Sequence, residues 1–167
     1  MTTGPTRVVA DVYTLPDLVV RAAERDPDGD ALVFPESRVS FSQLYDRAVD
    51  AARSLAALGV GPGAKVGILM ANCQEFVDIL LGSQLLGAWA VPINARYKAK
   101  ELGYVIADAD LRVLVTTDKV VEHVDFVALL DEAFPELSQQ TDPLALAMSS
   151  APELRSVVLH GDRTPSG

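Results

Sequence analysis

The chain has 167 residues, about the length of one ordinary domain, and 49% of them are hydrophobic, so it can bury a core of its own. Its 14 basic and 23 acidic residues give a net charge of −9. An acidic chain without a basic cluster is not expected to bind nucleic acid or an anionic membrane surface. The single cysteine excludes an internal disulfide framework and a cysteine-based metal cluster.

The first predicted element is a helix that begins after Thr14. Residues 1–13 form a lead-in that lacks the basic start and apolar core of a signal peptide. Thr14 is placed to cap the helix, with Pro16 in the first turn and Asp17 three residues after the cap. The acidic stretch 26–30 ends this helix.

A short strand and a second helix come next. Residues 31–34 are predicted to form the strand, and Val39 begins its return strand. Ser40 and Gln43 have the spacing of a capping box. The apolar face of the helix behind that box is made of Leu44, Ala48, Ala51, Ala52, Leu55 and Leu58. Gly59 is placed to end the helix.

From Lys65 the pattern changes to alternating strands and helices. Val66–Met70 is a continuous apolar run, as expected of a strand buried on both faces. A helix is predicted over Gln74–Leu86, stopped by Gly87, and a second buried strand over Ala88–Ile93, ended by its proline. The later predicted elements are a helix at 98–107 closed by residues 108–110, a strand at 113–116, a helix at 126–133 and a strand at 157–159.

This order predicts an α/β fold, a Rossmann-like parallel sheet with helices on both faces, because short strand–helix–strand connections imply right-handed parallel crossovers. Residues 138–152 form the most loop-like stretch, with a short helix predicted at 144–148. A mean hydropathy of +0.21 fits such a covered sheet, or a domain that docks onto more protein. The longest apolar stretch, Phe76–Val91, is too short and too polar to span a bilayer, so we expect a soluble, cytoplasmic chain.

Two glycine-rich patterns do not carry the chemistry that they resemble. Gly59–Ala64 matches the dinucleotide-binding fingerprint in letters, but here a helix precedes the glycines and a strand follows them, the reverse of what that site needs. We interpret the segment as a tight turn. Lys65 lacks the following Ser or Thr of a phosphate-binding loop, and we interpret it as a solvated lysine at a strand start.

The residue types that could form a metal or nucleophilic site are scattered. His123 and His160 have no second histidine at ligand spacing, and His160 is predicted to be a surface residue at a strand end. Cys73 lies at a predicted helix N-terminus, which could lower its pKa, although a packing role is favoured. The acidic clusters 26–30 and 108–110 are interpreted as solvated caps and loops. We therefore assign no catalytic, cofactor-binding or metal-binding residue to this chain.

Three segments together resemble one family. Val39–Leu44 is similar to an early helix start of the form (T/S)-(Y/F)-x-x-L, Leu58–Phe76 resembles the segment L-G-V-x-x-G-D-x-V-x-x-x-x-x-N-x-x-E-F, and Leu86–Leu102 resembles G-A-x-x-x-P-(L/I)-N-x-R-x-x-x-x-E-L. The family is the AMP-forming acyl-CoA synthetases, within the adenylate-forming enzymes. The resemblance extends from about Leu15 to about Asp162. Departures from the pattern occur at Ala64, often Asp in the family, and at Ala95, often Pro.

The resemblance implies an enzyme that uses ATP and Mg²⁺ to convert a carboxylic acid to an acyl-adenylate and then transfers the acyl group to coenzyme A. Its chemistry is carried by later motifs, among them a Ser/Thr/Gly-rich loop ending in Pro-Lys-Gly, and none of them occurs here. We expect residues 14–162 to be part of one subdomain of the large N-terminal domain of such a ligase, with 163–167 a truncated end. No cofactor is expected to bind this chain alone.

Within that resemblance, a few residues have scaffold roles. Asn72 is expected to cap the following helix. Asn94, Arg96 and Tyr97 lie just past a strand's C-terminal end, where α/β sheets bind ligands. They are expected either to form a pocket wall or an interdomain contact, or to brace their own loop.

Several hypotheses on function remain open. The first is the N-terminal scaffold of an acid–CoA ligase, inactive alone, whose partner is the remainder of the ligase in the same or a separate chain. The tail Asp131–Leu137 is more similar to fatty or alicyclic acyl-CoA synthetases than to amino-acid adenylation domains. The alternatives are a non-catalytic interaction module, a part of an acyl-AMP ligase or adenylation domain that serves a carrier protein, and a homo-oligomer in any of these cases. A flavodoxin-like binding domain ranks last, because the loops after Met70 and Ile93 contain no glycine.

Overall fold

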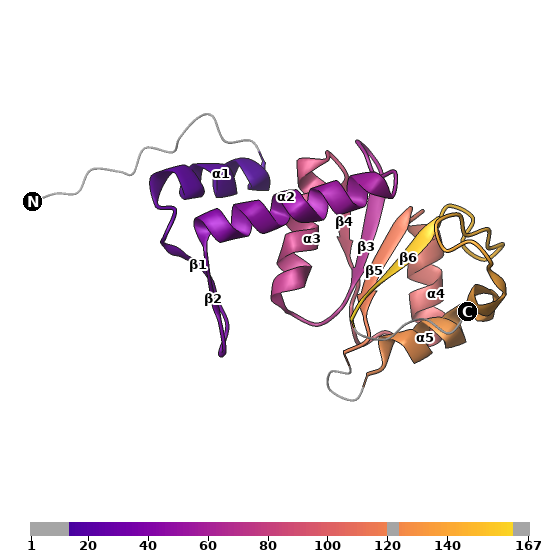
Figure 1. The fold of residues 1–167 in the computed structure, drawn as a ribbon. Helices are drawn as coiled ribbons and strands as arrows, with labels where there is room; N and C mark the ends of the chain where they lie inside the picture. Colours follow the sequence, from indigo (N-terminus) through magenta and orange to yellow (C-terminus); the bar gives the residue numbers. More distant parts are fainter. Residues whose placement is uncertain (1–13, 120–123, 162–167) are drawn as a thin grey trace, which may run out of the picture. The chain divides into compact units, whose positions relative to one another are not determined.

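The computed structural model describes residues 14–119 and 124–161 (Figure 1). The chain divides into two compact units, Met1–Asp46 and Arg47–Gly167. The predicted lead-in (1–13), the predicted end (163–167) and His123 lie outside the described residues.

The first unit begins with helix α1 (Leu15–Arg25), which starts at the predicted cap. Asp17 donates its backbone N–H to Thr14 Oγ1 at 3.2 Å, and Thr14 donates its own N–H to Asp17 Oδ2 at 2.9 Å. These two bonds satisfy backbone donors that the first helical turn leaves unpaired. The predicted capping box is therefore confirmed.

A two-stranded antiparallel hairpin follows, made of β1 (Asp30–Val33) and β2 (Arg38–Ser40). Arg38 and Asp30 form an ion pair across it. Helix α2 (Phe41–Ala57) begins at the second predicted capping box, in which Gln43 N donates to Ser40 Oγ at 3.3 Å and Ser40 N donates to Gln43 Oε1 at 3.0 Å. Gly59 follows the helix at φ +77°, a left-handed conformation that glycine adopts without strain.

The second unit contains a four-stranded parallel sheet in the order β4-β3-β5-β6. Its strands are β3 (Lys65–Leu69), β4 (Trp89–Pro92), β5 (Val113–Thr117) and β6 (Ser156–His160). Four of the five residues of β3 and all five of β5 are buried, as the apolar runs predicted. The predicted α/β class with a parallel sheet is confirmed.

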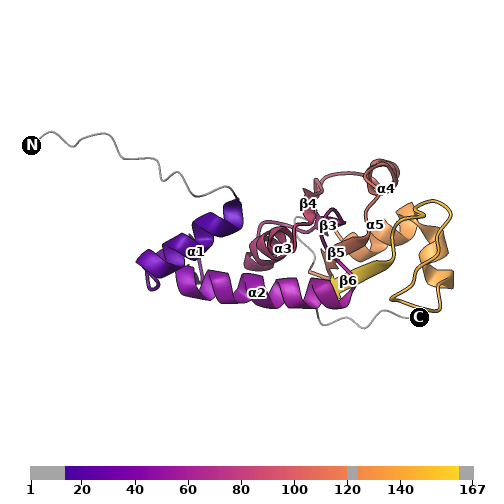
Figure 2. The same ribbon diagram turned by 90° about the horizontal axis from the view of Figure 1, so that it is seen from above.

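Helices cover both faces of this sheet (Figure 2). They are α3 (Gln74–Leu85), α4 (Ala99–Asp108), α5 (Phe126–Ala133) and a short 3₁₀ helix, η1 (Pro135–Gln139). Helix α3 and the C-terminal part of α2 lie on one face, whereas α4 and α5 lie on the other. None of the helices in the described ranges combines the length and the apolar character needed to cross a membrane.

Two hydrophobic cores result, one on each face. The core on the α3 side contains Leu55, Val60, Val66, Ile68, Met70, Ala88, Val113 and Val115. The core on the α4 side is larger and contains Leu69, Ile93, Leu102, Ile106, Leu111, Leu114, Phe126, Leu130, Phe134, Leu146, Met148, Ala151 and Leu154. Successive residues of β3 and β5 therefore enter opposite cores, as the two-residue period of a strand requires.

Strand β4 differs from the prediction of a second strand buried on both faces. It is the edge strand of the sheet, and its end residues Trp89 and Pro92 are exposed, Trp89 by 68%. The physical reason is strand order, since β3 pairs with both β4 and β5 and leaves β4 with one neighbour. An apolar run alone does not reveal this order. Pro92, which has no N–H for a further ladder, suits an edge position.

The predicted short helix at 144–148 is wrong. Leu146 and Met148 are buried while Ala145 and Ala147 are exposed, a period of two that belongs to extended backbone. Leu146 N donates to Arg155 O at 2.9 Å, and Ala147 N donates to Gln140 Oε1 at 2.9 Å. Partners outside the segment thus replace the bonds that a helix would make within it.

Glu136 binds the loop residues that follow Met148. Its carboxylate accepts hydrogen bonds from the backbone N–H groups of Ser149 and Ser150, at 3.2 and 2.9 Å, and from both hydroxyls. The hydrogen bonds from Ser150 are the main reason that the pKa of Glu136 is lowered, and those from Ser149 add to them against the opposing effect of burial. One carboxylate therefore holds the loop residues Ser149 and Ser150, which lie between Met148 and Ala151 of the core on the α4 side.

The middle of α2 lies very close to α3 at Gly82. A Cβ atom added to Gly82 would stand 2.8 Å from the backbone nitrogen of Ala52 and 2.8 Å from the Cβ of Ala51. Real Cβ atoms almost never come this close, and a backbone atom cannot move aside alone. Only glycine allows this helix–helix distance.

We expect Gly82→Ala to lower the free energy of unfolding by about 1–3 kcal/mol, as other small-to-large changes in packed cores do. The loss should appear in urea denaturation even though alanine favours helices. Gly61→Ala is the matched control, because nothing lies within 4 Å of the added Cβ there. Equal stability of the two variants would contradict the close approach.

A buried carboxylate also joins these helices. Arg47 of α2 donates from Nε and Nη2 to Asp78 Oδ2 of α3, at 3.0 and 2.8 Å. The Asp78 side chain is 9% exposed, and its Oδ1 has no hydrogen-bond partner within the described residues. Burial raises the pKa of Asp78, and this outweighs the opposing hydrogen bond and charge of Arg47. The pKa of Arg47 is raised in turn, chiefly by its hydrogen bond to Asp78.

We expect Arg47→Ala to cost about 3 kcal/mol at pH 7, because it leaves a buried carboxylate without its partner. Because the pKa of Asp78 is raised in the folded state, protonation of Asp78 favours folding at pH values below its ordinary pKa of about 4. This contribution to the free energy of unfolding is lost as pH rises through the raised pKa of the folded state. The loss in Arg47→Ala should therefore shrink when urea denaturation is repeated at pH 4.

Arg53→Ala is the matched control for this prediction. Arg53 lies on the same helix and pairs with Asp50 at 2.9 Å, but both side chains are about three-quarters exposed. An exposed pair of this kind contributes at most about 1 kcal/mol. If Arg47→Ala and Arg53→Ala lose the same stability at pH 7, the buried pair does not hold the helices together.

Candidate functional site

The carboxyl ends of β3, β4 and β5 meet at one edge of the sheet, because the three strands are parallel and adjacent. The chain leaves β3 toward α3 on one face, and it leaves β4 and β5 toward α4 and α5 on the other (Figure 2). Diverging loops of this kind open a crevice, and open α/β sheets bind their ligands at such a point.

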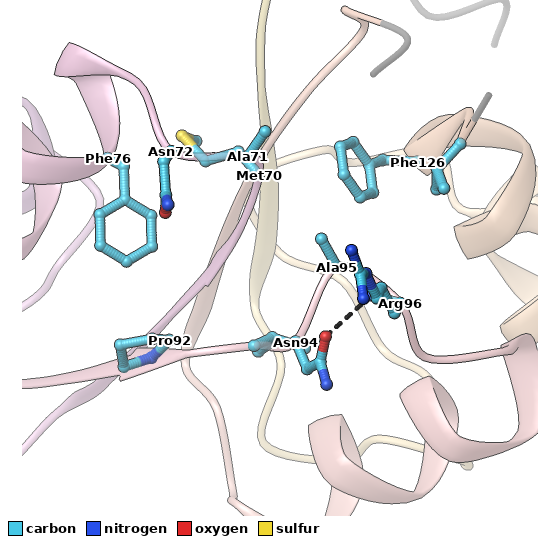
Figure 3. Close-up of a pocket in the computed structure, with 11 residues that line it drawn as sticks. Met70, Ala71, Asn72, Phe76, Pro92, Asn94, Ala95, Arg96 and Phe126 are labelled. Carbon is cyan, nitrogen blue, oxygen red and sulfur yellow. Dashed lines mark hydrogen bonds between the residues drawn. The ribbon is translucent and has the colours of Figure 1, made fainter. Parts of the chain in front are cut away.

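A cavity of about 510 Å³ occupies this crevice (Figure 3). Its lining comes from the loop after β3, the start of α3, the loop after β4 and the start of α5: Met70, Ala71, Asn72, Phe76, Pro92, Ile93, Asn94, Ala95, Arg96, Val124 and Phe126. Phe76 and Phe126 stand on opposite sides of the cavity, with Asn94 and Arg96 along its lower border in this view.

The lining determines what the cavity can accept. Apolar and aromatic side chains form most of it, and two carboxamides and one guanidinium supply hydrogen-bond donors and a positive charge. Such a surface suits a ligand with an apolar body and a polar or anionic end. Within the lining there is no acidic, histidine or cysteine side chain to act as a general base or nucleophile.

Asn94 and Arg96 do line the cavity, which is one of the two roles predicted for them. Asn94 also braces its own loop, since its Oδ1 accepts the backbone N–H of Arg96 at 3.0 Å and its carbonyl accepts the N–H of Tyr97 at 3.1 Å. Tyr97 is not part of the lining and packs against the core on the α4 side. The two predicted roles are therefore combined in Asn94.

The predicted cap of α3 at Asn72 is wrong. The helix begins at Gln74, as predicted, but its N-cap is Cys73, which makes no side-chain capping bond. Asn72 lies outside the helix and lines the cavity instead. Its carboxamide is thereby available at the site rather than used in the helix.

Cys73 is a packing residue, as the sequence favoured, and its pKa is raised overall although it lies at the helix N-terminus. Burial raises the pKa of the Cys73 thiol, and the neighbouring Glu75 adds to the effect although backbone N–H groups oppose it. The sulfur packs against the core on the α3 side and lies 3.7 Å from Met70 Sδ. A thiol that resists ionisation is a poor nucleophile at neutral pH.

The other candidates from the sequence lie away from the cavity. Gly59–Ala64 is a turn between α2 and β3, with Gly63 at φ +79°. Lys65 starts β3 and pairs with Asp110 at 3.3 Å. Among the described residues, no group of three or more His, Cys, Asp or Glu side chains could hold a metal ion.

Among the cavity residues that were not predicted from the sequence are the three large apolar side chains of Met70, Phe76 and Phe126. Met70 was assigned to a strand, and the two phenylalanines to helices. Phe126 is 1% exposed and so belongs to the core as well as to the lining. The signal that could have identified the region is position, because all three lie just after the carboxyl end of a strand or at the start of the helix that follows.

Comparison with known proteins identifies the class. The AMP-binding enzyme family matches residues 19–163, and the chain belongs to this family. An acyl-CoA ligase of Aspergillus fumigatus, sidI, is 31% identical over 122 residues, which are 72% of this chain and 21% of the relative. A 2-succinylbenzoate–CoA ligase of Oceanobacillus iheyensis is 32% identical over 106 residues, 63% of this chain and 22% of the relative.

Solved structures agree with the fold. The anthranilate CoA ligase AuaEII, in complex with anthranoyl-AMP, matches with a TM-score of 0.72 and 26% identity over 89% of this chain and 25% of that one. The N-terminal domain of FACL13 from Mycobacterium tuberculosis matches with a TM-score of 0.70 and 26% identity over 87% of this chain and 33% of that one. The chain thus spans between about a fifth and a third of the length of these proteins.

We expect Asn94→Ala to lower the free energy of unfolding by about 1 kcal/mol, because the turn loses the bond from Arg96 N. Asn72→Ala is the control, since Asn72 is exposed and its side chain makes no hydrogen bond within the described residues. Urea denaturation of both variants measures the difference. A loss in Asn72→Ala as large as in Asn94→Ala would contradict the bracing role.

Proposed function

We propose that this chain is the N-terminal scaffold portion of an acid–CoA ligase. Such a ligase activates a carboxylic acid with ATP and Mg²⁺ as an acyl-adenylate and transfers the acyl group to coenzyme A. The chain supplies a sheet and one wall of a cavity, and the reacting groups belong to the remainder of the ligase. Its partner is that remainder, in the same or a separate chain.

The observation that carries the proposal is the place of the cavity. It lies at the carboxyl edge of a parallel sheet, in a chain that belongs to the AMP-binding enzyme family. Its lining has binding groups but no nucleophile or general base. A wall without catalytic groups is what a scaffold portion requires, and Asn94 and Arg96 at its border are suited to a contact with a further domain.

A fatty or alicyclic acid is the substrate class that we propose for the whole ligase. Support comes from a fatty acyl CoA synthetase of Mycobacterium tuberculosis, which matches with a TM-score of 0.66 and 25% identity. Other relatives act on different acids by name, 2-succinylbenzoate and anthranilate among them. A carrier protein in place of coenzyme A is the alternative acceptor.

A non-catalytic interaction module is a second candidate, because large apolar side chains stand exposed. Trp89 and Tyr104 are each 68% exposed, and Leu144 is 67% exposed. Exposed apolar surface is typical of a face that another protein covers. The same surface would be covered in a complete ligase, so exposure alone favours neither candidate over the other.

We predict that the purified 167-residue chain does not catalyse ATP–pyrophosphate exchange with fatty, alicyclic or aromatic acids. The physical reason is that the cavity lining has no nucleophile, general base or carboxylate to hold Mg²⁺, and Arg96 is its one positive charge. The assay measures incorporation of labelled pyrophosphate into ATP. Acid-dependent exchange above the no-protein background would overturn the scaffold role.

Light scattering and dye binding separate the two candidates further. A monodisperse monomer that binds no hydrophobic dye would count against the interaction module, because its exposed apolar residues would then not form a continuous binding surface. A stable oligomer formed by the chain alone would favour the module.

A further inference from the structure

The sheet of the second unit has two edge strands, β4 and β6, which differ in the backbone groups that they present outward. Beside β4, Ile93 N donates to Ile68 O of β3 at 2.9 Å. Because backbone direction alternates along a strand, Ala90 and Pro92 of β4 face away from β3. Proline has no N–H, so Ala90 supplies the one outward donor of β4, and this edge is poorly suited to a further strand.

Backbone direction in β3 determines which residues of β5 face β6. Ile68 O faces β4, so the next carbonyl, Leu69 O, faces β5, where it accepts the Thr116 hydroxyl at 2.8 Å. Leu69 is the register partner of Thr116. In a parallel pair, a residue bonds to the two residues that flank its register partner. Val115 and Thr117 therefore face β3, whereas Thr116 faces β6.

The same step from β5 to β6 identifies the open backbone groups. Thr116 is the register partner of Leu159, so Val158 and His160 face β5. Val157 and Leu159 then direct their N–H and C=O groups outward. In the part of the chain that the structure describes, no strand lies beyond β6 to pair with them.

Arg155, the residue just before β6, marks where the open edge begins. Its carbonyl accepts Leu146 N at 2.9 Å, from a segment outside the sheet, while its N–H donates to Arg112 O at 2.8 Å, next to β5. The segment that contains Leu146 therefore covers the start of the outer edge, and the backbone groups of Val157 and Leu159 follow beyond it.

Strand β6 has the character of an interior strand. Its five residues pair with β5 in unbroken register, and they include no proline, glycine, lysine or bulge of the kind that protects natural edge strands. Val157 packs against the core on the α4 side and Val158 against the core on the α3 side. The three middle residues of β6 are nevertheless only half-buried, whereas all five residues of β5 are buried. Both faces of the sheet are thus incompletely covered at β6.

We propose that the outer edge of β6 is a docking surface for a strand of the remainder of the ligase. That strand pairs with the outward N–H and C=O groups of Val157 and Leu159 and so extends the sheet. It carries apolar side chains on both faces, because it continues both hydrophobic cores. The proposal rests on the proposed function, which supplies the remainder as the partner.

Two observations favour the remainder over a second copy of this chain. The chain spans between about a fifth and a third of the length of the relatives that it matches, so most of such a ligase lies outside these residues. A second copy has the same net charge of −9, which opposes self-association.

Amide hydrogen exchange, resolved by residue, tests the proposal without any variant. It is measured in the 167-residue chain and in the ligase that contains this chain, or in its complex with a separately encoded remainder. In the chain alone, we expect the N–H groups of Val157 and Leu159 to exchange at least about 100-fold faster than that of Val158. In the ligase, they should slow to the rate of Val158. Ala90, which faces outward at β4, is the control and should keep its rate.

A pair of proline variants gives a second measurement. Leu159→Pro removes an N–H that faces outward, so it should lower the urea midpoint of the ligase more than that of the chain alone. Val158→Pro is the matched control on the same strand. Its N–H faces β5, so this variant should lower both midpoints.

Each outcome bears on the proposal. Slower exchange at Val157 and Leu159 in the ligase, with no change at Ala90, supports it. Fast exchange at these two residues in a ligase that catalyses acid-dependent pyrophosphate exchange overturns it and leaves the proposed function intact. Equal slowing at Ala90 also overturns it, because protection would then not be specific to β6. A dimer of the chain alone that protects Val157 and Leu159 identifies a second copy as the occupant and overturns it as well.

Discussion

Pairing of β3 with β4 on one side and β5 on the other is the constraint on which the second unit depends. Val66 and Ile68 of β3 are fully buried, and the strand separates two hydrophobic cores. The central place of β3 sends the helix after it to one face and the helices after its neighbours to the other. The crevice at the carboxyl edge follows from that divergence, and the cavity follows from the crevice.

The two carboxylates near the start of α3 have pKa values that are shifted in opposite directions. Burial raises the pKa of Asp78, which makes its ionised form costly, whereas the helix N-terminus and three neighbours lower the pKa of Glu75. Asp78 faces α2 through Arg47, and Glu75 faces the end of β6 through His160. The two carboxylates of this helix therefore have different surroundings, and the cavity residue Phe76 lies between them in the sequence.

Local sequence signals predicted much of this fold. The capping boxes at Thr14 and Ser40 and the left-handed position of Gly59 depend on residues within a few positions of one another, and all three are present. Strand order has no such signal, and the prediction of a fully buried β4 was wrong for that reason. The pair Arg47–Asp78 joins residues 31 positions apart, which no periodic pattern reveals.

The cavity was predictable only in part. Asn94 and Arg96 could be identified because they follow a strand's carboxyl end, but Phe126 comes from a helix that only the folded sheet brings to the same place. Asn72 was predicted to cap α3, but the cap is Cys73, one residue later, and Asn72 lines the cavity. Small local shifts of this kind decide which side chains reach a site, and composition does not report them.

The central claim is that these residues form the scaffold portion of a longer ligase. The most direct test is to determine the coding sequence that follows the codon for Gly167. The account predicts that the reading frame continues and encodes a Ser/Thr/Gly-rich loop ending in Pro-Lys-Gly. A stop codon directly after Gly167, with no separately encoded chain that carries such a loop and binds this one, would contradict it.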